Sequence, residues 1–319
     1  MKRVLLLATL TAACGVAQAQ GNYPAKPIRF IVPFPPGGGT DIVSRLVANK
    51  LSDTLGWRIV IDNRAGAGGS VGMEAAANSA PDGYTLVMGQ TSNLAVNPSL
   101  YAKLPYVPLR DFSPVSLVSM IPVTFMVSAK APYKSIGDLV AAAKAKPAQI
   151  TFSSTGNGTI GHLTGEQLQR MAGIKLVHVP YKGASQAFPD LLGGRIDFFL
   201  ASLETAIPQA KAGTIRAIAV TSAQRAPVLP DVPTVAESGY KGFEAYTWTG
   251  VLVAARTPQP IIERLNKEIA RILDLPDMKE RLNTGGNPVQ TGPKAFTALL
   301  KADTEKWARI VKDAGLKVE

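Results

Sequence analysis

The stretch Phe30-Ile31-Val32-Pro33-Phe34-Pro35-Pro36-Gly37-Gly38-Gly39-Thr40-Asp41 combines a buried strand, an abrupt proline and glycine turn, and the start of a helix. Residues 28–32 are apolar and rich in β-branched side chains, as in a strand of a parallel sheet. The prolines then keep the chain extended, and the glycines allow unusual dihedrals or close approach to a ligand. We expect a helix over residues 42–55, capped by Thr40 or Asp41 and stopped by Gly56.

This arrangement has the geometry of an anion site. A strand that passes through a glycine turn into a helix places free N–H groups at the positive end of the helix dipole. A tight turn without a ligand produces the same pattern, so the motif alone leaves both interpretations open.

The chain has 319 residues, of which 46% are hydrophobic and 18% are charged. This length is sufficient for two domains with their own cores. The composition is that of a globular protein and not of a disordered one.

The N-terminus has the features of a secretory signal. Lys2 and Arg3 form a charged start, residues 4–13 an apolar run, and Ala17-Gln18-Ala19 a cleavage site. The apolar run is too short to span a membrane. We therefore expect residues 1–19 to be removed and the mature chain to be soluble in the periplasm.

The single cysteine, Cys14, lies inside this signal. A lipoprotein anchor is the alternative to simple cleavage, but residues 11–13 lack the aliphatic residue usual before a lipidated cysteine. After cleavage the chain has no thiol, which excludes disulfides, zinc–thiolate sites and cysteine nucleophiles.

The chain is basic. Its formal net charge of +11 becomes +9 when Lys2 and Arg3 are removed. The lysines and arginines are scattered, with no run of four and no interleaved aromatic stripe. We expect no nucleic-acid partner and interpret the charge as a surface that attracts small anions.

Strands and helices alternate along the first third of the chain, which predicts a parallel, doubly wound sheet. Further strands are expected at residues 57–62 and 84–88, with a helix between them at 73–78. Ligands bind beyond the carboxyl ends of strands in such sheets. The glycine turn and the polar loop Thr91-Ser92-Asn93 both lie at such ends.

The chain then crosses into a second lobe. Residues 115–127 form an apolar stretch too long for one ordinary strand, and we expect it to break at Pro122. The chain returns near residues 243–254, and two helices follow, at 260–273 and 293–314. The expected organisation is lobe 1 from residues 20–122 and 248–319, lobe 2 from 123–247, and hinge crossings near 120–127 and 243–252.

The second lobe repeats the opening motif. A strand at 149–153 leads through the turn Ser154-Thr155-Gly156-Asn157-Gly158-Thr159 into a helix at 160–171. The glycines match G-x-G-x-x-G, but a dinucleotide site needs an acidic residue after the next strand, where Tyr181 and Lys182 stand instead. The hydroxyl groups beside this helix N-terminus suit a carboxylate better.

A serine hydrolase is the rival interpretation. Gly68-Gly69-Ser70-Val71-Gly72 matches the G-x-S-x-G nucleophile elbow, and His162 or His178 would have to act as the base. Ser70 follows a long glycine loop instead of a strand, which weakens this reading. The sequence carries no H-E-x-x-H motif, clustered carboxylate triad or P-loop lysine, so we expect no metal and no cofactor.

Many ordered motifs resemble the Bug receptors, the extracytoplasmic solute receptors of tripartite tricarboxylate transporters (TctC-like). The resemblance covers essentially the whole mature chain. Its motifs are Tyr23-Pro24-Ala25-Lys26-Pro27-Ile28-Arg29, Val32-Pro33-Phe34-Pro35-Pro36-Gly37-Gly38, Thr40-Asp41, Asn63-Arg64-Ala65-Gly66-Ala67-Gly68-Gly69, Pro81-Asp82-Gly83-Tyr84-Thr85-Leu86, Asp111-Phe112, Val179-Pro180-Tyr181-Lys182-Gly183 and Asp231-Val232-Pro233-Thr234.

This resemblance implies a two-lobe α/β clamshell of the type II periplasmic-binding-protein kind, each lobe a doubly wound sheet flanked by helices. It implies a monomer, not an enzyme, that closes on a dicarboxylate, tricarboxylate, aromatic acid or amino acid and delivers it to transporter membrane subunits. One carboxylate would be held between the two turns. Asp41 would cap its helix or accept a hydrogen bond from a ligand amino group, and we favour capping. The implied ligand-binding residues are Phe34, Pro36, Gly37, Gly38, Asp41, Thr91, Ser92, Ser153, Ser154, Thr155, Gly156, Thr159, Tyr181, Lys182, Gly183, Ala184 and Ser202.

Overall fold

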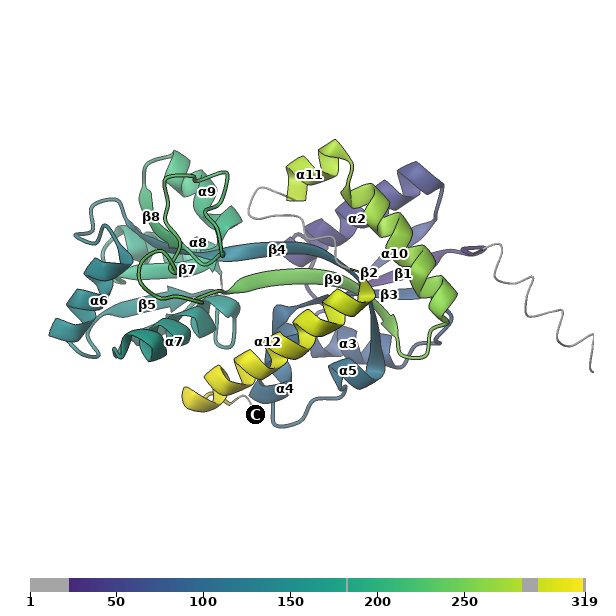
Figure 1. Ribbon diagram of the computed structural model, residues 1–319, viewed down its shortest axis with the longest axis horizontal. Coiled ribbons are helices and arrows are strands. Elements are labelled where there is room, and N and C mark those ends of the chain that lie inside the picture. The colour runs from purple at the N-terminus through teal and green to yellow at the C-terminus, as the bar shows by residue number, and fades with distance from the viewer. Residues whose placement is uncertain (1–22, 182, 283–291, 318–319) are drawn as a thin grey trace, which may run out of the picture.

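The computed structural model describes residues 23–181, 183–282 and 292–317 (Figure 1). Nine strands form one mixed sheet in the order β2-β1-β3-β9-β4-β7-β5-β6, and β8 pairs with β4. Residues 1–22 lie outside the described part, so the expected signal is not tested by it. None of the described helices is long and apolar enough to cross a bilayer.

One half of the sheet, here called lobe 1, begins with three parallel strands: β1 (Ile28–Val32), β2 (Ile59–Asn63) and β3 (Thr85–Gln90). Successive side chains of β1 are buried on opposite faces, as strand geometry requires. Phe30 packs in the cluster that contains α2 (Gly39–Leu55) and α10 (Gln259–Leu273), whereas Ile31 packs in the one that contains α3 (Ser70–Ala77). Helices therefore cover both faces, which explains why the strand is apolar throughout.

The other half, here called lobe 2, repeats this plan. β5 (Thr151–Ser154) is parallel to β6 (Val177–Pro180) and β7 (Phe198–Ser202), and β8 (Ile215–Val220) lies on the far side of β4. Four helices accompany them: α6 (Ile136–Ala145), α7 (Ile160–Ala172), α8 (Ala184–Leu192) and α9 (Leu203–Lys211).

Two long strands join the lobes. β4 (Phe112–Ser128) pairs with β9 (Tyr246–Ala254) up to Pro122, and from Val123 onward it pairs with β7 and β8. The predicted break at Pro122 is wrong, because this residue is the last of the β4–β9 register and the strand runs on as one element. The two lobes thus share a continuous sheet instead of holding two separate ones (Figure 1).

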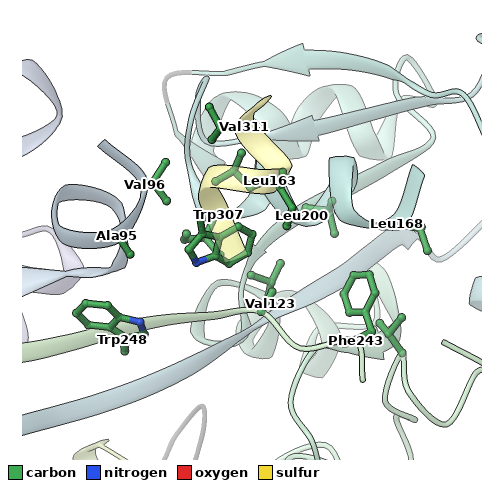
Figure 2. Close-up of a cluster of buried hydrophobic side chains, with 14 of the residues drawn as sticks. Ala95, Val96, Val123, Leu163, Leu168, Leu200, Phe243, Trp248, Trp307 and Val311 are labelled. Carbon is green, nitrogen blue, oxygen red and sulfur yellow. The ribbon is translucent and has the colours of Figure 1, made fainter. Parts of the chain in front are cut away.

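The C-terminal helix α12 (Pro293–Asp313) contacts both lobes. It packs against β4 and against α4 (Asn97–Leu100), and it also reaches α7, where Arg170 and Asp313 form an ion pair of 3.4 Å. Figure 1 shows α12, in yellow, running from lobe 1 towards α7. Its Trp307 is fully buried among Val123, Leu163 and other apolar side chains (Figure 2).

Most expected elements are present with small shifts in their ends. Gly56 ends α2 in the left-handed conformation, as predicted, and Ser135 is the N-cap of α6. The elements that the sequence did not reveal are short: α5 (Pro108–Asp111), α11 (Pro276–Leu282), the 3-10 turn Ala67–Gly69, and the π-turn Ser92–Val96 that leads into α4.

Candidate functional site

A cavity of about 340 Å³ lies between the lobes. It is located where β3, β5 and β7 end, in agreement with the expected place of a ligand in a sheet of this kind. Lobe 1 lines it with Phe34, Gly68, Gln90, Ser92, Asn97, Leu100, Tyr101 and Thr247. Lobe 2 lines it with Val123, Thr155, Asn157, Gly158, Thr159, Ile160, Gly161, Ala201, Ser202 and Thr205.

The turn after β5 brings polar groups to the N-terminus of α7. Thr159 is the N-cap, and its hydroxyl accepts from the His162 amide at 3.4 Å and donates to the Gly156 carbonyl at 2.7 Å. Thr155 and Asn157 stay exposed beside it. Because the first amides of a helix lack intrahelical partners, this end of α7 can accept an anion.

Lobe 1 reaches this turn through Leu100. A Cβ atom placed on Gly158 would lie 2.3 Å from Cδ2 of Leu100, the last residue of α4. Gly158 also has φ of +73°, a conformation that side-chain-bearing residues rarely adopt. The absence of a side chain here allows the two lobes to meet beside the cavity.

The first glycine turn is organised differently from the expectation. The N-cap of α2 is Gly38 and not Thr40 or Asp41, so the predicted cap is wrong. Asp41 is 2% exposed, and its carboxylate accepts from the Gly37 amide, Arg45 Nε and Asn63 Nδ2, each at 2.9 Å. The carboxylate therefore links the first turn of α2 to the glycine turn before it and to β2. Its three hydrogen-bond donors are protein groups.

These hydrogen bonds set the protonation of Asp41. Burial acts to raise the pKa of the carboxyl, but the hydrogen bonds from Arg45, Asn63 and Gly37 outweigh it and lower the pKa to about 2. The folded-state pKa is thus below that of the unfolded chain. The stabilisation is fully present above pH 4 and is lost as the pH falls from 4 towards 2.

We expect Asp41→Asn to lower the free energy of unfolding at pH 7 by on the order of 2 kcal/mol, since a shift of this size corresponds to that energy. Urea unfolding at several pH values measures it. The difference between wild type and variant should shrink between pH 4 and pH 2. A constant difference across that range would contradict the assigned role of the carboxylate. Asp53→Asn, on the same helix, is the matched control.

The structure brings five of the predicted site residues to the cavity wall: Phe34, Ser92, Thr155, Thr159 and Ser202. Ligand contact stays a prediction for these five residues and for the others alike. Lys182 lies outside the described residues. The predicted residues that do not line this cavity are Pro36, Gly37, Gly38, Asp41, Thr91, Ser153, Ser154, Gly156, Tyr181, Gly183 and Ala184.

Besides Asp41, three of these side chains are buried and engaged with the protein. Thr91 joins β3 to β9, since its hydroxyl donates to the Tyr246 carbonyl and accepts from the Trp248 amide. Ser153 lies within the sheet, and the Ser154 hydroxyl contacts the Gly156 carbonyl and His178.

Sequence reasoning missed much of the cavity wall. Gln90 and Asn157 stand next to predicted residues, so the strand end and the turn gave a usable signal for them. Leu100, Tyr101, Thr205 and Thr247 gave none, because they come from elements that only the tertiary fold brings to this place. The described lining residues carry no charged side chain, so neutral donors and the end of α7 face the cavity.

The hydrolase alternative finds no support in the geometry. Ser70 is the buried first residue of α3, in lobe 1. Both histidines belong to lobe 2, where His162 accepts from the Gly158 amide and His178 contacts Ser154. Among the described residues, no group of three His, Cys, Asp or Glu could hold a metal.

Two α/β lobes on a shared sheet, with a cavity of mixed polar and apolar lining between their strand ends, are the architecture of a solute-binding receptor. Comparison with known proteins agrees. The family model of the tripartite tricarboxylate transporter family receptor matches residues 43–316. The protein BugT of Bordetella pertussis is 37% identical over 100% of this chain and 99% of its own.

Two solved structures have the same fold. Rpa4515 of R. palustris, solved with adipate, has a TM-score of 0.82 and 33% identity over 93% of this chain and 100% of its own. MatC (Rpa3494) from Rhodopseudomonas palustris, solved with malate, has a TM-score of 0.77 and 31% identity over 91% and 100%. The chain belongs to the tripartite tricarboxylate transporter receptor family, as its sequence motifs predicted.

Proposed function

We propose that this receptor captures a small carboxylated solute in the cavity between its lobes and hands it to the membrane subunits of a tripartite tricarboxylate-type transporter. The single observation that carries the proposal is the N-terminus of α7, with Thr155, Asn157 and Thr159 beside it, at the wall of an interlobe cavity. Amide and hydroxyl donors in this arrangement suit a carboxylate. The relatives solved with adipate and malate support the same class of ligand.

The ligand class stays broad at this point: dicarboxylate, tricarboxylate, aromatic acid or amino acid. The cavity combines hydroxyl and amide groups with Phe34, Leu100 and Ile160, so it offers both polar and apolar walls. The proposed location is the periplasm, after removal of residues 1–19. The receptor is proposed to act as a monomer and to release its ligand chemically unchanged.

The lobes are proposed to open and close around the solute. Among the described strands, β4 runs through both halves of the shared sheet and the chain returns to lobe 1 where β9 begins, so bending near residues 120–127 and 243–252 admits the ligand. The helix α12 also touches both lobes, and its contact with α7 has to adjust in the same motion.

We expect Thr155→Ala to weaken binding of the carboxylic acid tenfold to a hundredfold. Removing one hydrogen bond to a charged group costs roughly 1.5–3 kcal/mol. Titration calorimetry measures the affinity, with Thr155→Ser as the control that keeps the hydroxyl. Because Thr155 is exposed in the free protein, the ligand-free variant should have the same melting temperature as ligand-free wild type. Full affinity in the alanine variant would exclude this side chain from the site.

A further inference from the structure

The only two histidines of the chain form a stacked pair beneath the 154–159 turn. The ring centroids of His162 and His178 lie 3.8 Å apart, and the ring planes differ by 8°. Phe152 adjoins His178, with 4.8 Å between ring centroids. His162 comes from the first turn of α7 and is 3% exposed, and His178 comes from β6.

Each imidazole makes a contact with one end of the 154–159 turn. Nδ1 of His162 accepts a hydrogen bond from the Gly158 amide at 3.1 Å. Nε2 of His178 lies 2.8 Å from Oγ of Ser154, which in turn contacts both the amide and the carbonyl of Gly156. Thr155 and Asn157, which line the cavity, stand between these two attachment points.

The contact with Gly158 depends on protonation. An imidazole nitrogen accepts from an N–H group only when it carries no proton of its own. A proton on Nδ1 of His162 would face the Gly158 amide, donor against donor. Gly158 would then leave its place, and with it the contact that the turn makes with Leu100 of lobe 1.

We propose that His162 and His178 are positioning residues for the ligand-binding turn, and that a proton on this pair and a solute in the cavity exclude one another. The receptor therefore binds its solute best when both imidazoles are neutral, and it releases the solute more readily in acid. This inference rests on the proposed function, since it takes the 154–159 turn to contact the ligand.

One carboxylate is close enough to His162 to stabilise a protonated imidazole. Glu166 faces His162 from the same helix, with 3.6 Å between Oε1 and Nε2. On the neighbouring elements, Arg170 of α7 pairs with Asp313 of α12, and Asp190 of α8 accepts a hydrogen bond from Tyr181. Loop residues 155–159 and Phe152 carry no charge.

Burial supports the neutral form of His178. Desolvation, followed by the effect of the neighbouring His162, lowers the pKa of His178 to about 3. The folded-state pKa lies below the ordinary value of about 6.5, so the unfolded chain takes up the proton first as the pH falls. Stability is fully present above pH 6.5 and decreases as the pH falls from there towards 3.

The test compares wild type with His162→Asn/His178→Gln, both purified without a histidine tag. Asparagine places an oxygen near the position of Nδ1, and glutamine places an amide near that of Nε2, so both contacts can persist without a titrating group. Adipate and malate serve as probes in calorimetry from pH 7.5 to 5.0. These acids titrate themselves, and the double variant reports that contribution.

Each protein is compared with its own affinity at pH 7.5. The loss of affinity on going to pH 5.0 should be severalfold larger for wild type than for the double variant, because only wild type can place a proton on the pair. His162→Leu, which lacks the acceptor, should bind at least tenfold more weakly at pH 7.5. Parallel pH profiles for wild type and the double variant would overturn the proposal. So would full affinity in His162→Leu at pH 7.5.

A readout of imidazole protonation, measured with and without a bound acid, separates this inference from the proposed function. The imidazole NMR signals of the free wild-type protein should titrate, and an acid that binds should lower the pH at which the pair takes up its first proton. Midpoints that are unchanged by a bound acid overturn the inference alone. Failure of every carboxylic acid to bind overturns the proposed function, whatever the imidazole signals do.

Discussion

Gly158→Val should reduce the affinity for the carboxylic acid by at least about a hundredfold. Valine has two effects here: backbone strain lowers stability, and a clash with the opposite lobe lowers affinity. Valine at a positive φ costs on the order of 1–3 kcal/mol, and the new side chain would occupy the space of Leu100 in the opposite lobe. The lobes could then meet beside the cavity only after the turn or α4 had moved. Titration calorimetry, with the melting temperature of the free protein recorded alongside, gives the result.

The chain offers a matched control for the backbone strain. Gly173 ends α7 with φ of +62°, and no atom lies within 4 Å of the position of its Cβ. Gly173→Val should therefore lower stability but leave the affinity within about twofold. Adding Leu100→Ala to Gly158→Val should recover part of the affinity, because it removes the obstructed side chain. Equal losses in the two valine variants would contradict an interlobe contact at Gly158.

Trp307→Ala should lower the free energy of unfolding by about 3–5 kcal/mol, the usual cost of removing a large buried aromatic side chain. Trp307 is fully buried, and the residues around it come from both lobes and from α12 (Figure 2). The cavity left behind would loosen the attachment of α12 to β4 and α7. Urea unfolding at pH 7 measures the loss.

Two further variants sharpen this measurement. Trp307→Phe should cost clearly less than the alanine variant, because it keeps a ring and because the described residues give the indole N–H no hydrogen-bond partner to lose. Lys301→Ala, at an exposed position of the same helix, should leave stability within about 0.5 kcal/mol. A loss below 1 kcal/mol in Trp307→Ala would show that α12 is not a structural link between the lobes.

The sequence predicted the parallel portions of the sheet well. Residues 28–32 carry apolar side chains on both faces, and glycines and prolines stand at the strand ends, so local signals and tertiary structure agree there. The crossing was recognised by its length, but its continuity was not. A proline within an apolar run predicts the end of a strand. Pro122 is the last residue that pairs with β9, and β4 continues past it by pairing with β7 and β8.

The role of α12 was not predictable from its pattern. An amphipathic helix reveals that it has a buried face, but not which partners cover that face. The sequence placed residues 293–314 in lobe 1, yet the helix also packs on α7 of lobe 2. Only the tertiary fold decides between these alternatives.

The candidate site was predicted in outline. The turn after β5 was recognised from its glycines and hydroxyl groups, and Thr155 and Thr159 do line the cavity. In the first glycine turn, Asp41 engages the Gly37 amide and Phe34 lines the cavity, and the ligand contacts predicted for Pro36, Gly37 and Gly38 stay predictions. No local pattern could show that Ser154 would contact a histidine 24 residues away.

Calorimetric titration of the mature protein with a panel of carboxylic acids, each paired with its neutral amide, tests most directly whether this is a carboxylate receptor. The panel contains dicarboxylates such as adipate and malate, tricarboxylates, aromatic acids and amino acids. We predict saturable one-site binding of at least one acid, at least tenfold weaker binding of its amide, and recovery of the acid unchanged after incubation. Equal binding of acid and amide, no binding across the panel, or consumption of the bound acid would contradict the proposed function.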